Sequence, residues 1–222
     1  MRIRAASIRR FSPIYGKFLF RLPEKAEVLD VGCGNCHSLE IIAAFRPDLS
    51  WYGVDIEEFP GGIGFLKGFR RADLNSERVD FPDGKFDGIR ICHVLEHLTD
   101  LRVLRSEIVR LLKPGGLVYI ETPTRTDCAF PPAPSRRSKG GGFNFRDDPS
   151  HVRPFGVEEL RVFVEECGLE VLVVEVIRNP WKILFSPAIL LFGLIARNRF
   201  WLTAVVWEIT GRCSCVIGRK AS

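Results

Sequence analysis

The stretch Asp-Val-Gly-Cys-Gly-Asn-Cys-His at residues 30–37 contains residue types that serve three different kinds of chemistry. Cys33, Cys36 and His37 form a C-x-x-C-H pattern, which is typical of covalent haem attachment. The two cysteines alone would suit a redox pair or half of a zinc site. Gly32 and Gly34 would instead form a tight turn whose backbone approaches a nucleotide closely.

Cysteine usage weakens the first two interpretations. The chain of 222 residues has seven cysteines, an odd number without a disulfide framework, and its basic N-terminus lacks the apolar core of a signal peptide. We therefore expect a reducing, cytoplasmic location, where covalent haem attachment is unusual. A zinc pair would need two more ligands, for which Cys92 and His93 are the nearby candidates. We expect no metal.

The hydrophobic pattern predicts strands and helices that alternate along the chain. Short β-rich runs predict strands at residues 26–31, 50–56, 68–74, 85–94, 117–123, 169–177 and 213–220. Apolar residues at helical spacing predict helices at residues 36–45, 101–113 and 157–168. This alternation predicts an α/β fold with an open, mostly parallel sheet and helices on both faces.

Sheets of this kind bind ligands outside the carboxyl ends of their strands. Gly32 and Gly34 follow the first strand and precede a helix, whose free N–H groups would point at the ligand. Asp55 ends the second strand, where an acid can bind both ribose hydroxyls. The dinucleotide fingerprint needs a third glycine, and His37 occupies that position, which argues against NAD.

Five segments in register resemble the class I S-adenosylmethionine-dependent methyltransferases, in particular the small-molecule branch that includes the quinone-biosynthesis enzymes. These segments are VLDVGCGNC, GVDIE, RADLN, FPDGKFDGIRICHVLEHLTD and VRLLKPGGL. The resemblance implies a Rossmann-like, doubly wound sheet of seven strands with an antiparallel last strand, in a single domain at residues 26–222. The family's first motif usually has a third glycine where this chain has Cys36, which predicts a slightly altered pocket.

The resemblance also implies roles for individual residues. Asp30, Gly32 and Gly34 would lie under the methionine part of the cofactor, and Asp55 would bind the ribose. Ile56 and Leu74 would lie against the adenine ring and Asp73 beside its amino group, while Cys92 and His93 would lie beside the sulfonium. The expected cofactor-binding residues are Asp30, Gly32, Cys33, Gly34, Asp55, Ile56, Asp73, Leu74, Cys92 and His93.

A methyl sulfonium is already activated, so the protein mainly has to align the reactants and exclude water. A base is needed only where the acceptor must lose a proton. The fourth strand ends in Ile-Cys-His-Val, without the N/D-P-P-Y tetrad of adenine- or glutamine-type N-methylation and without the Pro-Cys of cytosine methylation. His151 is the candidate general base, and the alternative is that it anchors a loop.

Two insertions and an N-terminal cap are expected around the site. Residues 123–155 are rich in proline and glycine and predict a lid. Residues 181–210 include an uninterrupted uncharged stretch of 14 residues at 183–196, which is shorter than the ~20 residues that span a bilayer as a helix. We expect this insertion to roof the acceptor site, as a helical cap, a homodimer face, or a lining that contacts a lipid-like acceptor or a membrane. The resemblance implies that residues 1–25 form a basic helical cap that closes over the cofactor, and contact with anionic lipid is the alternative.

The leading hypothesis is a methyltransferase that acts on a small, hydrophobic or lipid-linked acceptor, in the cytoplasm or peripheral to the inner face of the membrane. An RNA methyltransferase is an alternative that the net charge of +5 permits, but no separate RNA-binding domain or stacking motif is present, so nucleic acid is not the expected partner. A non-catalytic S-adenosylmethionine-binding protein is the third hypothesis.

Overall fold

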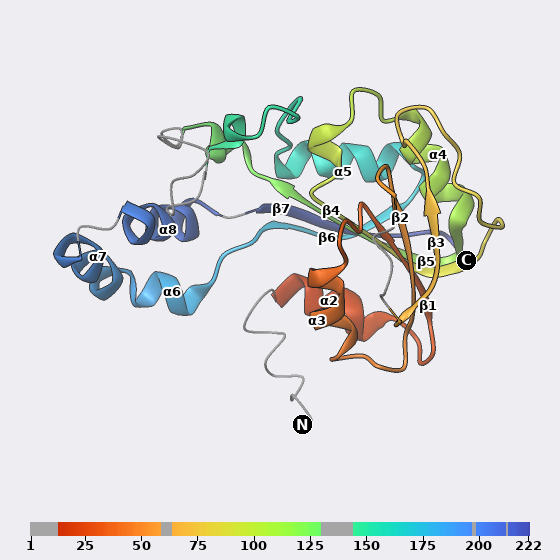
Figure 1. The fold of residues 1–222 in the computed structure, drawn as a ribbon, viewed down its shortest axis with the longest axis horizontal. Coiled ribbons are helices and arrows are strands. Elements are labelled where there is room, and N and C mark those ends of the chain that lie inside the picture. The colour runs from red at the N-terminus through yellow and green to blue at the C-terminus, as the bar shows by residue number, and fades with distance from the viewer. Residues whose placement is uncertain (1–12, 59–63, 130–143, 197–198, 212) are drawn as a thin grey trace.

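A seven-stranded sheet with strand order β3-β2-β1-β4-β5-β7-β6 forms the centre of the fold (Figure 1). The computed structural model describes residues 13–58, 64–129, 144–196, 199–211 and 213–222. The strands are β1 (Glu27–Val31), β2 (Ser50–Asp55), β3 (Leu66–Arg71), β4 (Phe86–Cys92), β5 (Leu112–Pro123), β6 (Glu170–Val176) and β7 (Cys213–Arg219). Pairing is parallel from β3 to β5, whereas β7 is antiparallel to both β5 and β6. The predicted Rossmann-like sheet is confirmed.

Helices cover both faces of the sheet because β1 sends alternate side chains to opposite sides. Val28 belongs to a hydrophobic cluster with α2 and α3, and Leu29 belongs to another with α4 and α5. The four helices are α2 (Pro13–Arg21), α3 (His37–Ala43), α4 (Arg102–Leu111) and α5 (Val157–Glu166). The order of strands reverses between β1 and β4, so the carboxyl ends of these two strands are where such a sheet binds a ligand.

Two predicted boundaries are wrong, for a physical reason. The apolar pattern predicts a helix to residue 113, but α4 ends at Leu111, and Leu112 already pairs with Phe86 of β4. The pairing then shifts register before Gly88, so residues 114–116, Pro-Gly-Gly, lie inside β5 and not in a helix-ending turn. The third strand was expected at 68–74 but ends at Arg71, after which the N–H of Ala72 donates to the carbonyl of Asp55.

The N-terminal helix α2 lies along the sheet face and not over the carboxyl ends of the strands. The rings of Tyr15 and Phe18 pack against Tyr119 of β5, with centroids 5.0 and 5.6 Å away. Phe18 and Leu22 also fill the space beside Gly88, where an added Cβ would lie 3.1 and 2.8 Å from them. The described part of the expected cap is therefore a core element, and residues 1–12 lie outside the described residues.

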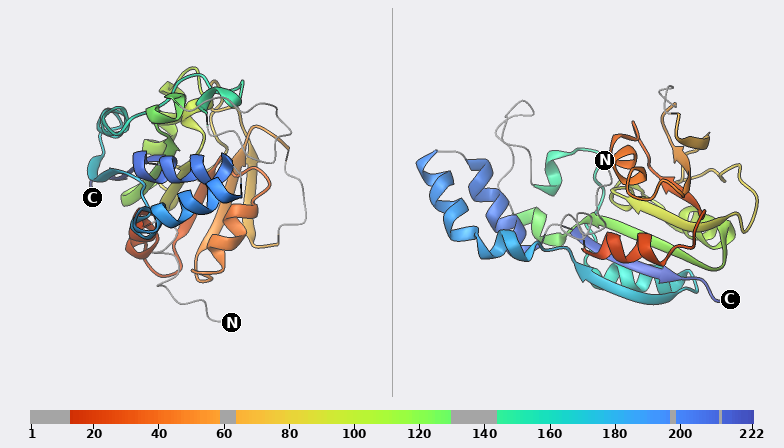
Figure 2. Two further views of the ribbon diagram at one scale, coloured as in Figure 1. Left: turned by 90° about the vertical axis from the view of Figure 1, so that its left-hand side faces the viewer. Right: turned by 90° about the horizontal axis from the view of Figure 1, so that it is seen from below.

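Residues 180–210 form three helices that we call the arm. They are α6 (Pro180–Leu184), α7 (Ser186–Ile195) and α8 (Arg199–Thr210). The arm leaves the sheet after β6 and returns at β7, at the same edge where β1, β4 and β5 end. Figures 1 and 2 show α6 and α7 extending away from the sheet. Within the arm, α8 packs beside α7, and its Trp207 contacts Asp127 near the end of β5. No helix among the described segments has the length and apolarity to cross a bilayer.

Candidate active site

The glycine turn after β1 has the backbone shape that the sequence predicts. Gly32 and Gly34 have φ of +70° and +51°, in the left-handed region that favours glycine. A Cβ added to Gly32 would lie 2.3 Å from Cγ2 of Val94, which follows β4, so only glycine lets these two segments approach. The turn is thus pressed directly against the residues that end β4.

Asp55 clamps this turn from the end of β2. One carboxylate oxygen accepts the N–H of Gly34 at 2.7 Å, and the other accepts the N–H of Glu57 at 3.1 Å. Each oxygen keeps a lone pair that can accept a ribose hydroxyl. The next side chain, Ile56, is 51% exposed although it is large and apolar, which is the state expected of a residue that lies against an adenine ring.

Asp30 lies below the turn in an environment that the sequence did not reveal. Its carboxylate is buried and pairs at 2.5 Å with Arg90, whose guanidinium lies over the ring of Tyr15. Burial raises the pKa of Asp30, and the charge of Arg90 offsets part of that rise. Asp30 Oδ2 has no hydrogen-bond partner among the residues the structure describes, so it can accept from a bound amino group.

The cysteines of this stretch are packing residues. Cys33 and Cys36 are both buried, and burial raises the pKa of both thiols, which disfavours the thiolates needed for redox or metal chemistry. Cys36 has φ +56°, a conformation that glycine adopts with less strain. The family's third glycine is therefore a backbone requirement that this chain meets with a strained cysteine.

Asp73 and Leu74 follow β3 and have local roles in the structure. Asp73 Oδ1 accepts from the backbone and side-chain amides of Asn75, at 2.9 and 3.0 Å. Asn75 in turn accepts the N–H and hydroxyl of Thr99. Leu74 is buried in the core cluster. Of the two apolar residues expected beside adenine, Ile56 is the exposed one.

The end of β4 brings a histidine and a buried glutamate together. Cys92 ends the strand, and burial raises the pKa of its thiol. His93 has φ +56°, and its Nδ1 lies 3.2 Å from Glu96, in the 3₁₀ helix η1 (Leu95–His97). Burial lowers the pKa of His93, but the hydrogen bond to Glu96 and the charges of Glu96 and Glu121 raise it above the usual value. The sequence analysis did not single out Glu96 as a partner, although the i, i+3 spacing in His-Val-Leu-Glu permits it.

His151, the candidate base, lies beside η1. Its Nδ1 is 2.6 Å from the carbonyl oxygen of Phe145, and its ring stacks on that of Phe145 and tilts against His97. His97 in turn contacts the hydroxyl of Ser150 at 2.9 Å. These contacts fasten the end of the predicted lid to η1. The described ends of the lid contain the 3₁₀ helices η2 (Arg125–Ala129) and η3 (Phe145–Asp147), and residues 130–143 lie outside the described part of the chain.

Asp127 joins the lid to the arm, and the sequence analysis missed it. The residue is 3% exposed, and its Oδ1 accepts the indole N–H of Trp207 in α8 at 2.9 Å. Burial raises the pKa of Asp127 to about 6, although the hydrogen bonds from Trp207 and Thr124 act in the opposite direction. The joint between arm and sheet therefore contains a carboxyl group that titrates near neutral pH.

Two groups of side chains among the described residues have potential metal-ligand atoms within 4.8 Å of one another. The first group is Glu96, His97 and His151, and the second is His93, Glu121 and Cys213. In the first group every member already binds a protein partner, namely Thr122, Ser150 and the carbonyl of Phe145. In the second, Glu121 accepts the hydroxyl of Tyr119 at 2.5 Å. These contacts explain both groups as internal hydrogen-bond networks.

The fold and the clamped glycine turn define a nucleotide-binding α/β protein of the Rossmann-like class. A family model described as a methyltransferase domain matches residues 3–174, and the chain belongs to this family of S-adenosylmethionine-dependent methyltransferases. The residues of the turn are compatible with that cofactor, because they combine two left-handed glycines, the carboxylates of Asp30 and Asp55 and the exposed apolar side chain of Ile56. When bound, S-adenosylmethionine supplies an activated methyl group.

Individual relatives agree with this assignment. A probable S-adenosylmethionine-dependent methyltransferase of Mycolicibacterium smegmatis is 28% identical over 167 residues, which cover 73% of this chain and 59% of that protein. A ubiquinone biosynthesis O-methyltransferase of Xanthomonas oryzae is 30% identical over 112 residues, 47% of this chain and 46% of that one. The chain thus spans about half of the length of these curated relatives. The solved structure of an S-adenosylmethionine-dependent methyltransferase from Archaeoglobus fulgidus superposes with a TM-score of 0.59 at 22% identity, covering 97% of this chain and 92% of that one.

Proposed function

We propose that this protein transfers a methyl group from S-adenosylmethionine to a small hydrophobic acceptor that it meets at a membrane surface. The observation that favours this function is the shared edge of the sheet. The clamped glycine turn and the root of the arm both lie at the carboxyl ends of the strands. The candidate cofactor site and the root of the apolar arm therefore share one edge of the sheet.

The cofactor half of the proposal is tested by Asp55→Ala. The substitution removes the ribose-binding carboxylate and also releases the N–H of Gly34, so the affinity for S-adenosylmethionine should fall at least tenfold in calorimetry. Asp80→Ala is the matched control, because the side chain of Asp80 is 95% exposed and lies away from the turn. Equal affinities of the two variants would contradict the placement of the cofactor.

The arm supports the acceptor half, because its apolar side chains face outward. Seven large apolar residues at 180–195 are more than half exposed: Trp181, Leu184, Phe185, Leu191, Phe192, Leu194 and Ile195. The opposite side of α7 faces α8. The exposed face of α7 has no charged residue, because the helix contains none. Soluble proteins rarely expose a large continuous apolar patch, so this face indicates contact with a protein partner or with lipid.

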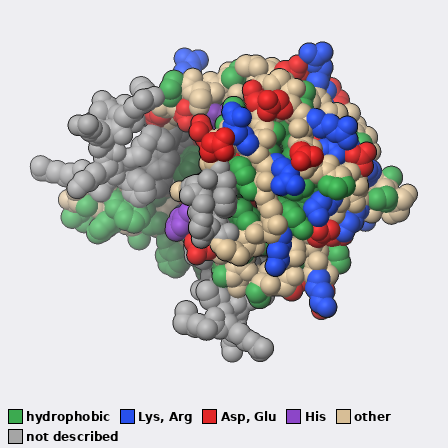
Figure 3. Space-filling model, turned by 45° about the vertical axis from the view of Figure 1, so that its right-hand side comes forward, with side chains coloured by type: hydrophobic (Ala, Val, Ile, Leu, Met, Phe, Trp, Pro, Cys, Tyr) green, Lys and Arg blue, Asp and Glu red, His purple; other side chains and the backbone are tan. Residues whose placement is uncertain are grey.

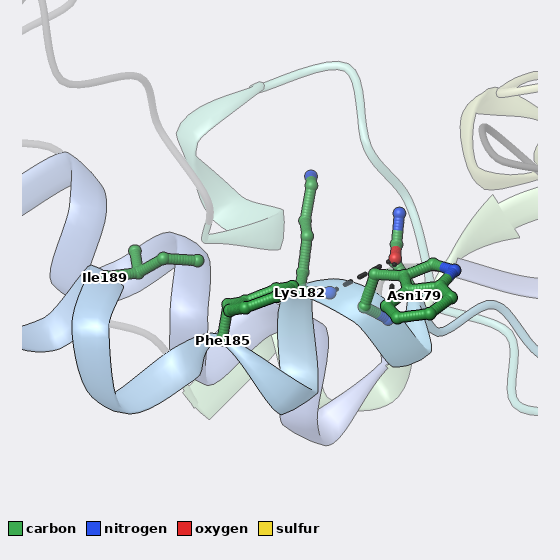
Figure 4. Close-up of a pocket in the computed structure, with 5 residues that line it drawn as sticks. Asn179, Lys182, Phe185 and Ile189 are labelled. Carbon is green, nitrogen blue, oxygen red and sulfur yellow. Dashed lines mark hydrogen bonds between the residues drawn. The ribbon is translucent and has the colours of Figure 1, made fainter.

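The root of the arm has the aromatic and cationic residues that bind at a lipid interface. An open pocket of about 390 Å³ is lined by Asn179, Trp181, Lys182, Phe185 and Ile189. Figure 4 shows these side chains along α6 and the start of α7. Asn179 caps α6 by accepting the N–H groups of Trp181 and Lys182, at 3.1 and 3.2 Å. Trp181 is exposed, and indole and ammonium groups next to an apolar helix are the usual anchors at the headgroup level. We therefore infer that α6 and α7 dip into the membrane interface without crossing it.

Vesicle flotation tests the membrane contact. Full-length protein should float with vesicles of phosphatidylcholine and phosphatidylglycerol, and the double variant Leu191→Asp, Leu194→Asp should remain at the bottom of the gradient because both substitutions place charge on the exposed face. Val162→Asp is the control, since Val162 is a similarly exposed apolar residue on α5. A wild-type protein that stays unbound and elutes as a dimer would assign the arm to self-association instead.

The charged side chains of the described residues do not favour an RNA methyltransferase function. Lys and Arg are interspersed with Asp and Glu over the face in Figure 3, and no open cationic groove is visible there. Arginines near β3 pair with acids, as Arg70 does with Asp80 and Arg78 with Asp83. An RNA-binding surface would instead present unpaired cations to phosphates. Gel-shift titration at low salt should show no binding of a structured RNA.

The acceptor class is tested with methyl-labelled S-adenosylmethionine and three acceptors in the same vesicles. These are an alkyl catechol, a long-chain fatty acid and phosphatidylethanolamine, which offer a hydroxyl, a carboxylate and an amine. We expect labelled product in the lipid phase with the catechol, in line with the O-methyltransferase named among the relatives. Absence of product from all three, with S-adenosylmethionine bound, would favour a non-catalytic or different role.

A further inference from the structure

We infer that His93 takes the proton from the methyl acceptor and that the buried carboxylate of Glu96 orients it. The inference rests on the proposed function, and it narrows the acceptor to groups that must lose a proton when they are methylated, of which we take a hydroxyl group as the test case. An acceptor that attacks through a carboxylate is already deprotonated and needs no base. An acceptor hydroxyl must lose its proton as the new bond forms.

Glu96 is fully buried and is held by contacts at both ends. One of its oxygens lies 3.2 Å from His93 Nδ1, and the other accepts the hydroxyl of Thr122 at 3.0 Å. Its backbone carbonyl accepts the N–H of Val152 at 2.6 Å, so the residue is held from both ends. A carboxylate in this position accepts a proton-bearing Nδ1, which leaves the lone pair of Nε2 free to act as the base.

The position of His93 places it beside the reacting groups. It directly follows β4, and the next residue, Val94, is pressed against Gly32 of the cofactor turn. The His93 side chain is half exposed, so a substrate can reach it, while its backbone has the strained φ of +56°. A non-glycine residue in this conformation at the end of a strand is commonly held there for function.

The charges around His93 favour proton uptake. Glu121 of β5 places Oε1 3.8 Å from Nε2, and the charge of His93 acts to lower the pKa of Asp127 in η2. Arg90 of β4 acts in the opposite direction. Glu96 and Glu121 together outweigh it, so an imidazolium formed during the reaction is stabilised within the site.

The acceptor oxygen bonds to the methyl carbon while the carbon–sulfur bond breaks, and the electron pair of that bond stays on sulfur. The hydroxyl proton moves to His93 Nε2 and then leaves to solvent through the exposed side of the ring. Glu96 contacts neither reactant and is a positioning residue.

His151 is less well placed for this role. Its Nδ1 is engaged by a backbone carbonyl, and its ring lies against Phe145 and His97. A carbonyl fixes the ring but cannot stabilise an imidazolium as a carboxylate does. We therefore assign His151 to anchoring the lid.

Nitrogen NMR of the full-length, ¹⁵N-labelled protein tests the dyad without any acceptor. The chain has four histidines, His93 is identified by its missing resonance in His93→Gln, and exposed His37 serves as the internal reference. Neutral His93 should carry its proton on Nδ1, and its pKa should fall by about one pH unit in Glu96→Gln, with the reference unchanged. A neutral ring protonated on Nε2, or a pKa unaffected by Glu96→Gln, would overturn the inference.

The pH profile of methyl transfer to the alkyl catechol provides the second readout. The neutral ring is the active form, so kcat should rise with pH up to the pKa of His93, and Glu96→Gln should move that rise to lower pH. Loss of the ring in His93→Gln should lower kcat about 100-fold or more. An unchanged profile in Glu96→Gln would refute the dyad, as would a preference for the fatty acid. Failure of wild-type protein to bind S-adenosylmethionine would refute the proposed function instead, and the NMR result would still be readable.

Discussion

The glycine turn and the arm lie at the same edge of one sheet but are stabilised in opposite ways. In the turn, Asp55 accepts the N–H of Gly34, an added Cβ at Gly32 would overlap Val94, and the cysteines are buried. In the arm, Ile195 is 74% exposed and several apolar neighbours are more than half exposed, and the arm contacts the lid through the hydrogen bond of Trp207 with Asp127. The difference is that the turn packs entirely against the protein itself, whereas the arm leaves an apolar face exposed, which is the face that we propose for the membrane contact.

The largest effect is expected where the turn is tightest. Gly32→Ala adds a Cβ that overlaps Val94 and forces alanine into φ +70°, so we expect a loss of about 3 kcal/mol in the free energy of unfolding. Gly34→Ala is the matched control, because it also has a positive φ but no atom within 4 Å of the added Cβ. It should lose only about 1–2 kcal/mol. Urea unfolding at pH 7 measures both, and equal losses would show that Val94 moves freely.

The fold and the cofactor turn were predictable because their evidence is local. The strand, glycine turn and helix at 26–45 are consecutive, and Asp55 ends the next strand, so spacing alone places them together. Arg90 beside Asp30 was not predictable, because the two residues are 60 positions apart and meet only through the pairing of β1 with β4. The outward course of the arm was missed for a similar reason: the sequence shows that α7 is apolar but not which side of it faces α8.

A pH-dependent effect is expected at the joint of the arm. Asp127 has a folded pKa of about 6, above its ordinary value near 4, so the folded state holds the extra proton between these values. The protonated Asp127 side chain therefore contributes to the free energy of unfolding below about pH 4, and this contribution is lost as pH rises through 6. Asp127→Asn keeps an oxygen for Trp207 but cannot ionise.

We expect Asp127→Asn to be more stable than wild type by up to about 2 kcal/mol at pH 8, and equal to it near pH 4. Thermal unfolding across this range measures the difference, with exposed Asp80→Asn as the control that should show no such trend. A difference that does not change with pH would mean that Asp127 is already ionised freely in the folded protein.

The smallest expected change in stability is at Cys36, where two substitutions separate backbone strain from packing in the glycine turn. Cys36→Gly and Cys36→Ala both delete the buried thiol, but glycine adopts φ +56° without the steric cost that alanine has. We expect the glycine variant to be more stable than the alanine variant by about 0.5–1 kcal/mol, because its larger unfolded-state entropy offsets part of the gain. At Cys167, which is also buried but has φ −76°, the order should reverse. If alanine were favoured at both positions, the strain at Cys36 would be negligible, and the missing third glycine of the family would have no energetic consequence in this chain.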